Sequence, residues 1–267
     1  MIIILFAILG LIIGSFLNVL VFRTKIEDSL LGRSYCPKCK KKIDWYDNIP
    51  VLSFIILGAQ CRQCRQKISW QYPIVEIITA IVFALVASRF FSVFDPATWT
   101  ITFYYLVTFS LLIAILVYDY LYMEIPGIIL WPAIGFVVAF GLIFDWTQKD
   151  TFFDILELNI YSGALAAFLA FLFFFLLVTL SKERWMGMGD AYLVILLGLF
   201  AGWPKIFLGL FLAFFLGSIY GITLIAMKKK NMKSQVPFAP FLIIGTAIAV
   251  FAYSPITIWY FNLFSAY

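Results

Sequence analysis

The sequence contains no histidine, and charged residues account for only 12% of its 267 positions. The missing imidazole removes the usual general base and the commonest nitrogen ligand for metals, so acid–base chemistry near neutral pH must use carboxylates, cysteine, lysine or tyrosine. The hydrophobic content is 64%, well above the roughly one half that is typical of soluble domains. A soluble interior cannot hide so many apolar side chains, and the composition therefore predicts a membrane protein.

Apolar runs long enough to cross a bilayer recur along the chain. A transmembrane helix needs about 20 apolar residues, and alternating strand patterns of about ten residues are absent. We therefore expect an all-α polytopic membrane protein with about eight transmembrane helices. The runs lie near 1–22, 74–94, 100–118, 126–144, 159–180, 191–204, 206–227 and 238–263. The first lacks the basic start and cleavage site of a signal peptide, so we expect it to remain as a helix.

The distribution of Lys and Arg predicts the orientation, because basic residues concentrate in cytoplasmic loops. If the N-terminus is outside, the inside segments hold 16 of the 19 Lys and Arg residues, most of them in residues 23–72. Only Arg89, Lys149 and Lys205 then lie outside. We therefore expect both termini outside and the loop of residues 23–72 in the cytoplasm.

All four cysteines lie in this loop, in two CxxC pairs separated by a spacer of 21 residues. Such pairs are typical of a tetrahedral thiolate zinc site, and four sulfurs leave no coordination position for a substrate. Disulfides are disfavoured in a cytoplasmic segment, and a redox CxxC would not need a second copy. We predict a small zinc-binding loop domain with structural Zn²⁺ held by Cys36, Cys39, Cys61 and Cys64.

The predicted orientation, built from basic residues alone, places Asp119 and Asp190 at the same membrane face. Two carboxylates at one depth can share a proton, so that one acts as base toward water and the other as acid toward a carbonyl oxygen. An ordinary helix-end role stays open, with Asp190 as an N-cap. Glu76 begins the second run, where a carboxylate is costly and indicates a function, a paired partner or an interfacial position.

Several motifs occur together and in order along most of the chain. They are Gly14-Ser-Phe-Leu-Asn-Val-Leu20 with Arg23, the two cysteine pairs, Trp45-Tyr-Asp-Asn-Ile-Pro-Val-Leu-Ser53, Ile68-Ser-Trp-Gln-Tyr-Pro-Ile-Val-Glu76, the segment from Asp119 to Ile125-Pro126, Gly187-Met-Gly-Asp190 and Pro237-Phe-Ala-Pro-Phe241. In this combination the sequence resembles the bacterial prepilin peptidases, also called type IV leader peptidases, a GxGD family of intramembrane aspartyl proteases.

The resemblance implies that Asp119 and Asp190 are the catalytic pair, supported by the motif residues Gly187, Gly189 and Pro126. It implies type IV prepilins and type II secretion pseudopilins as substrates, cut after a glycine on the cytoplasmic side of the bacterial inner membrane. Members with the four-cysteine loop usually also N-methylate the new terminal residue with S-adenosylmethionine. Both activities are therefore expected, in contact with the lipid bilayer and with no nucleic acid partner.

The resemblance also suggests a division of the chain. Residues 1–22 would form the first transmembrane helix, residues 23–72 the methyltransferase-associated zinc loop, and residues 73–267 the aspartyl peptidase membrane domain of about seven helices. A carboxylate such as Glu76 could help to align the amine that is methylated. Three positions depart from the usual family pattern: Tyr192 in place of lysine, Gly127 in place of aspartate and Ala239 in place of glycine.

Three other functions stay open on the sequence alone. The chain could be a peptidase without methyltransferase activity. It could be a non-enzymatic zinc-containing scaffold, which would tolerate the loss of both aspartates. It could be a transporter, which would favour charges nearer the membrane centre.

Overall fold

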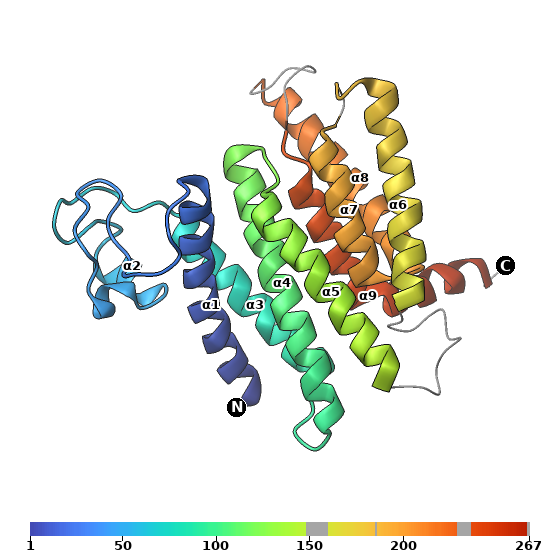
Figure 1. The fold of residues 1–267 in the computed structure, drawn as a ribbon, viewed down its shortest axis with the longest axis horizontal. Coiled ribbons are helices and arrows are strands. Elements are labelled where there is room, and N and C mark those ends of the chain that lie inside the picture. Colours follow the sequence, from blue (N-terminus) through green and yellow to red (C-terminus); the bar gives the residue numbers. More distant parts are fainter. Residues whose placement is uncertain (148–159, 185, 229–235, 266–267) are drawn as a thin grey trace. The chain divides into compact units, whose positions relative to one another are not determined.

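The computed structural model describes residues 1–147, 160–184, 186–228 and 236–265, so Lys149 lies outside it. The helices are α1 (Ile2–Lys25), η1 (Trp45–Asn48), α2 (Leu52–Ile56), α3 (Gln71–Phe90), α4 (Pro96–Tyr122), α5 (Gly127–Thr147), α6 (Ile160–Ser181), α7 (Met188–Ala201), α8 (Lys205–Ala226) and α9 (Ala239–Ser265), as Figure 1 shows. In the described ranges, extended pairing is limited to two isolated bridges. The all-α class is confirmed.

Seven of the described helices are long and apolar enough to cross a membrane. The sixth predicted span, near 191–204, corresponds to α7, whose 14 residues rise roughly 21 Å against a hydrocarbon layer of about 30 Å. Its side chains Leu193, Val194, Leu196 and Leu197 have no exposed surface. A helix enclosed by other helices does not have to match the lipid along its length, which explains why a short helix is tolerated here.

Two compact units divide the chain, Met1–Val117 and Tyr118–Tyr267, with the boundary inside α4. This division differs from the predicted one, which assigned everything from residue 73 onward to one membrane domain. The physical reason is that α3 packs closely along α1. The second predicted transmembrane helix therefore belongs with the first helix and the cysteine loop.

In the first unit, two glycines spaced four apart allow α1 and α3 to approach closely. A Cβ on Gly10 would lie 2.6 Å from Cα of Ala80, and one on Gly14 would lie 2.7 Å from Cα of Glu76. This is the small-xxx-small packing that membrane helices use in place of hydrophobic association. It sets Glu76 at a close contact between the two helices.

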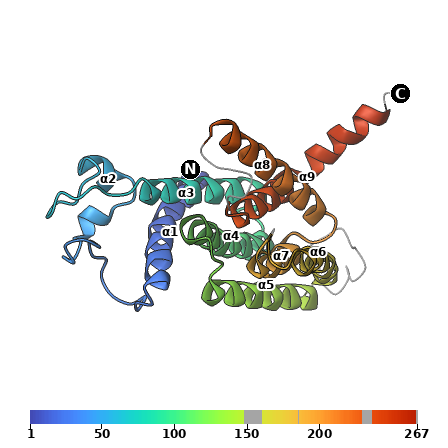
Figure 2. The ribbon, with the colours of Figure 1, turned by 90° about the horizontal axis from the view of Figure 1, so that it is seen from above.

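In the second unit, α7 contacts α5, α6, α8 and α9, and Figure 2 gives a view along this group of helices. Among these neighbours, α6 packs most extensively along α7, and a Cβ on Gly198 would run into the backbone of Ala167. The helices α8 and α9 meet similarly, because Gly245 lies against the backbone of Gly209. Glycine at these contacts fixes the position of α7, the helix that carries Asp190.

Candidate functional site

The end of α4 and the start of α7 bring Asp119 and Asp190 near each other within the second unit. Asp119, predicted as the end of the third helix, lies in the last turn of α4, which continues to Tyr122. Asp190 lies in the first turn of α7. The negative charge of Asp119 acts on Asp190, so the two carboxylates are within electrostatic reach of each other.

Asp119 is almost fully buried, with only 5% of its surface exposed. The backbone N–H of Ala239, the first residue of α9, donates a hydrogen bond to its carboxylate. The oxygen Oδ2 is buried and has no hydrogen-bond partner among the described residues. Since a buried acceptor without a partner is costly, this oxygen marks a place for a proton or for a further donor.

Asp190 helps to begin α7. The N-cap is Gly187, so Asp190 is the third residue of the helix, and its interpretation as an N-cap is wrong. Its carboxylate instead accepts a hydrogen bond from the backbone N–H of Gly187, which satisfies one of the free donors at the helix start. The positive end of the helix dipole adds to this stabilisation. These contacts hold the carboxylate at the beginning of α7.

Of the two motif glycines, Gly189 lets the start of α7 approach the connection between α4 and α5, whereas a Cβ on Gly187 would meet no close neighbour. A Cβ on Gly189 would lie 3.3 Å from Cβ of Ile125, which is tighter than an ordinary contact. The neighbouring Pro126 is buried, and its carbonyl accepts the first hydrogen bonds of α5. Gly189 and Pro126 therefore join the segment that follows Asp119 to the segment that carries Asp190.

The departures from the family pattern fit the packing of the second unit. Tyr192 stacks on Phe171 of α6 at 6.4 Å and meets Trp131 of α5 at 5.6 Å, measured between ring centroids. Its ring therefore links three helices at the start of α7. A Cβ on Gly127 would make only ordinary contact with Trp131, at 3.5 Å, so no steric requirement for glycine acts there.

The third departure, Ala239, has no exposed surface. The preceding Phe238 packs against Phe214 at 5.2 Å and Phe174 at 6.5 Å between ring centroids. These aromatic contacts anchor the start of α9, so that the N–H of Ala239 reaches Asp119. The methyl group is accommodated, and the contact that matters is made by the backbone.

In the first unit, the structure brings together the four cysteines. Their sulfur atoms all lie within 4.8 Å of one another, and Sγ of Cys36 and Sγ of Cys64 are 3.9 Å apart. A tetrahedral site with Zn–S bonds of about 2.3 Å requires sulfurs about 3.8 Å apart. The donor set and its spacing therefore fit a closed thiolate zinc site.

The two cysteine pairs have the same backbone geometry. The N–H of Cys36 donates to the carbonyl of Lys41, and the N–H of Cys61 donates to the carbonyl of Gln66. The residue after each second cysteine, Lys40 or Arg65, has a left-handed φ of 59° or 54°. Each pair forms a tight turn that directs two sulfurs to one side, as a metal site requires.

Backbone N–H groups also favour the metal-binding form of the Cys61 thiol. The N–H groups of Cys64 and Gln63 lower the pKa of the Cys61 thiol to about 7. Since metals bind the thiolate, these donors favour the ligating form of Cys61 near neutral pH.

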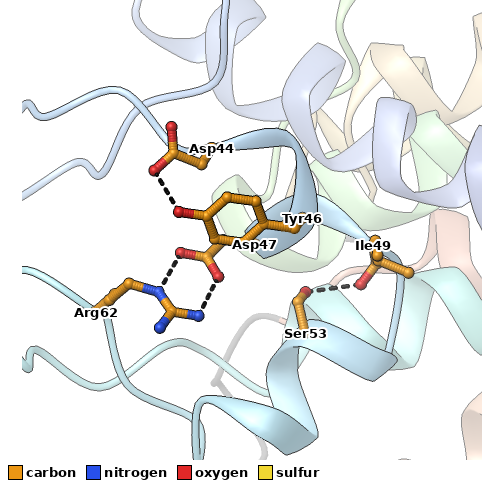
Figure 3. A network of polar contacts seen from close by, with 6 residues as sticks. All are labelled: Asp44, Tyr46, Asp47, Ile49, Ser53 and Arg62. Atoms are coloured by element: carbon orange, nitrogen blue, oxygen red, sulfur yellow. Dashed lines mark hydrogen bonds and ion pairs between the residues drawn. The ribbon is translucent and has the colours of Figure 1, made fainter.

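An ion pair joins the second cysteine pair to the segment between the pairs. Figure 3 shows Arg62 holding Asp47 with two hydrogen bonds, from Nε at 2.7 Å and from Nη2 at 2.6 Å. Nearby, the Tyr46 hydroxyl donates to Asp44 at 3.1 Å, and the Ser53 hydroxyl donates to the carbonyl of Ile49 at 2.7 Å. This bidentate geometry fixes η1 and α2 on the cysteine cluster.

Glu76 has partners, and they are uncharged. Only 6% of its surface is exposed. Its Oε2 accepts a 2.7 Å hydrogen bond from the backbone N–H of Val51, and the Ser15 hydroxyl donates to the same carboxylate. Among the described residues, Glu76 forms no ion pair. It therefore connects α1, α3 and the segment between the cysteine pairs.

The motif Gly14-Ser-Phe-Leu-Asn-Val-Leu20 contains side chains that hold α1 against α3. Asn18 donates from Nδ2 to the carbonyl of Tyr72 at 3.2 Å and accepts from Gln71 at Oδ1, at 3.4 Å. Together with Ser15, it ties α1 to the first turns of α3. Sequence reasoning had quoted Ser15 and Asn18 in a motif without assigning them a role, and their spacing on one helix face was the signal.

Val51 takes part in the contact with Glu76, and the sequence assigned it no role. Its φ of 60° and ψ of −47° place it at the centre of a γ-turn, closed by a hydrogen bond from the N–H of Leu52 to the carbonyl of Pro50. This turn is rare and strained, above all for a β-branched residue. It directs the Val51 N–H at Glu76, and no sequence signal reveals it.

Arg23 organises the loop that leads to the first cysteine pair. It is 3% exposed, and its guanidinium donates to the carbonyl oxygens of Ser29, Leu31, Gly32 and Arg33 at 2.7 to 3.4 Å. Four acceptors for one planar donor group leave little freedom to the loop. The end of α1 therefore holds the loop in a defined path.

Comparisons with known proteins identify the family of the chain. Residues 8–90 match the Bacterial Peptidase A24 N-terminal domain, and residues 106–222 match the Type IV leader peptidase family. The relative from Myxococcus xanthus, named prepilin leader peptidase/N-methyltransferase, is 33% identical over 82% of this chain and 62% of its own length. Relatives with the same name from Pseudomonas aeruginosa and Bacillus subtilis are 30% identical over 91% of this chain, covering 87% and 91% of their own lengths. No solved structure gives a significant match.

The two matched regions separate the two sites. Residues 8–90 contain the cysteine cluster and Glu76, whereas residues 106–222 contain both aspartates. The apolar helices agree with a multi-pass membrane protein. The chain therefore belongs to the type IV leader peptidase family and is an aspartic peptidase.

Proposed function

We propose that Asp119 and Asp190 form the catalytic dyad of a prepilin peptidase. The observation that carries this proposal is the meeting of two carboxylates, one of which has a buried oxygen without a partner among the described residues. Two carboxylates at short range in a low dielectric hold one proton between them. The titration then belongs to the pair and not to either residue.

In the proposed reaction, the ionised aspartate takes a proton from a water molecule while the protonated one donates to the carbonyl oxygen of the scissile bond. The water oxygen bonds to the carbonyl carbon. The C–N bond then breaks as the departing amine takes a proton from one aspartate. A hydroxyl of the tetrahedral intermediate gives its proton to the other aspartate, so that the carbonyl re-forms and the dyad again holds one proton. The N–H of Ala239 holds the Asp119 carboxylate in place during these transfers.

The proposed substrates are type IV prepilins and type II secretion pseudopilins with a basic leader. The names of the relatives support this class. We propose that both sites face the cytoplasm in the bacterial inner membrane, with both termini outside, because this orientation leaves 16 of the 19 basic residues inside. A topology reporter inserted in residues 23–72 tests it, and a periplasmic signal there contradicts it.

The first unit is proposed to support N-methylation of the new terminal residue. The methyl donor, S-adenosylmethionine, supplies a methyl group whose C–S bond breaks with its electron pair left on sulfur, while the amine nitrogen forms the new C–N bond and loses a proton. Cys36, Cys39, Cys61 and Cys64 would hold Zn²⁺ as a structural ion, because four sulfurs close the coordination shell.

Mass spectrometry of a co-expressed prepilin tests both activities, because leader loss and methyl addition are separate mass changes. Asp119→Asn and Asp190→Asn should each abolish leader loss. Glu183→Gln is the matched control, since it neutralises an exposed carboxylate of the same unit and should cleave normally. Cleavage by either aspartate variant at the wild-type rate would refute the dyad and favour a scaffold. Cleavage without methylation by the wild type would leave a peptidase only.

A further inference from the structure

A cavity of about 340 Å³ lies within the first unit, lined by residues of α1, the first turns of α3, both cysteine pairs and the segment between them. Glu76 lines it together with Ser15 and Val51, which donate hydrogen bonds to its carboxylate, and with Asn18. A cavity of this size lies at the lower end of the range for small-molecule sites, which is about 300–1,000 Å³. It suits one nucleoside-sized molecule and not a folded peptide segment.

The lining combines features that rarely occur together. Four aromatic side chains contribute flat apolar surface, namely Phe22, Tyr35, Phe54 and Tyr72. Charges of both signs also line it, with Glu76, Asp44 and Asp47 among the acidic groups and Arg23, Lys41, Lys42 and Lys67 among the basic ones. A lipid tail would require apolar walls alone, and a simple anion would be repelled by the carboxylates. The lining instead matches a zwitterion that also carries an aromatic base.

Among the acidic groups, Glu76 is the one available to a cationic ligand. Asp47 is neutralised by its bidentate pair with Arg62, and Asp44 lies 3.6 Å from the Arg33 guanidinium, whereas Glu76 has only the uncharged donors Val51 and Ser15. A buried carboxylate that no described cation neutralises is costly unless a ligand supplies the positive charge. The cavity therefore has a preference for a cation next to Glu76.

We propose that this cavity is the binding site for S-adenosylmethionine, with its sulfonium and amino acid portion near Glu76 and its adenine among the aromatic side chains. The inference rests on the methyl transfer proposed above, and it locates that reaction in the first unit. The cysteine cluster forms part of the wall through Cys36 and Cys61. Loss of the metal would therefore deform the donor site directly.

Binding measurements on the full-length, zinc-loaded protein in detergent test the proposal without any turnover. Sinefungin carries a cationic amine in place of the sulfonium, whereas S-adenosylhomocysteine carries a neutral sulfur. Glu76→Gln keeps an acceptor for the Val51 N–H but removes the charge. It should weaken sinefungin about tenfold, the usual scale for a charged hydrogen bond, and S-adenosylhomocysteine clearly less. Equal weakening of both ligands would contradict the placement of the cation at Glu76.

Two matched pairs separate the cavity from general effects. Glu27→Gln removes an exposed charge in the same loop outside the cavity, and it should bind both ligands like the wild type. Val19→Phe fills the cavity from α1 without removing a polar group, and it should abolish binding while leader cleavage continues. Leu9→Phe places the same aromatic side chain at an exposed position on the same helix and should have no effect.

Ultraviolet cross-linking of radiolabelled S-adenosylmethionine to the wild-type protein gives a test that needs no variant. Peptide mapping should place the label between residues 15 and 76. A label confined to residues 118–267 would overturn the proposal, even if the protein methylates prepilins. A wild-type protein that neither methylates nor binds sinefungin would instead refute the methyltransferase function itself, so the two failures are distinguishable.

Discussion

The backbone N–H of Val51 donates a 2.7 Å hydrogen bond to Oε2 of Glu76, which joins a residue with a left-handed φ in the cysteine loop to a buried carboxylate of α3. The γ-turn at Val51 is costly by about 1–3 kcal/mol. The turn is tolerated because the Val51 N–H donates to the buried Glu76 carboxylate, which would otherwise have one hydrogen-bond donor fewer. The loop and the paired helices α1 and α3 are thereby held together by a contact that no apolar packing could replace.

This bond predicts opposite behaviour for two substitutions at one position. Val51→Gly relieves the left-handed φ and keeps the N–H, so the stability should change by less than about 1 kcal/mol. Val51→Pro removes the donor and cannot adopt a positive φ, and it should destabilise the loop by roughly 1–3 kcal/mol. Hydrogen exchange of residues 45–57 measures the difference. Equal protection in the two variants would show that the Val51–Glu76 bond does not hold the loop.

Removal of the metal should affect the two proposed activities differently. The cysteine cluster lies in the first unit and both aspartates lie in the second. Cys64→Ser should therefore lower the zinc content and abolish methylation, while leader cleavage continues. Glu27→Gln is a control in the same loop, since it removes an exposed charge outside both the cysteine cluster and the cavity. Metal analysis and mass spectrometry of the prepilin give the three readouts, and loss of cleavage in Cys64→Ser would show that the units are coupled.

The cysteine cluster could be predicted from the sequence because its ligands come in two local pairs, each of which forms a turn by itself. The proximity of Asp119 and Asp190 could also be predicted in part, since alternating helices return helix ends to the same membrane face. The grouping of α3 with α1 could not, because the apolar composition of a run does not say which neighbour it packs against. The small-residue spacing of Gly10 and Gly14 was the available signal.

The Asp47–Arg62 ion pair predicts a pH-dependent contribution. Arg62 lowers the pKa of Asp47 below its ordinary value of 3.8. A carboxylate with a lowered pKa in the folded state stabilises the protein above the ordinary pKa, and this contribution is lost as the pH falls through the lowered pKa. Asp47→Asn should therefore reduce the protection of residues 45–64 at pH 7, and the difference from the wild type should vanish in strong acid.

Comparison of the two proteins at each pH removes the separate effect of acid on the cysteine ligands, because that effect is common to both. Asp28→Asn, another aspartate of the same loop, is the control, since it bonds Tyr35 and not Arg62. A difference between Asp47→Asn and the wild type that persists unchanged in strong acid would show that charge is not the source of the stabilisation.

The packing of α7 predicts that an inert methyl group can stop the peptidase. Gly198 lies against the backbone of Ala167 in α6, so Gly198→Ala must push the two helices apart. Overpacking of this kind costs about 1–3 kcal/mol and would shift the helix that carries Asp190.

Gly221→Ala on α8 is the matched control, since nothing lies within 4 Å of its added Cβ. There the better helix propensity of alanine should raise stability by up to about 1 kcal/mol. Thermal unfolding and leader cleavage should therefore both fall for Gly198→Ala and be preserved for Gly221→Ala. Full cleavage by Gly198→Ala would mean that the position of Asp190 does not depend on the α6–α7 contact.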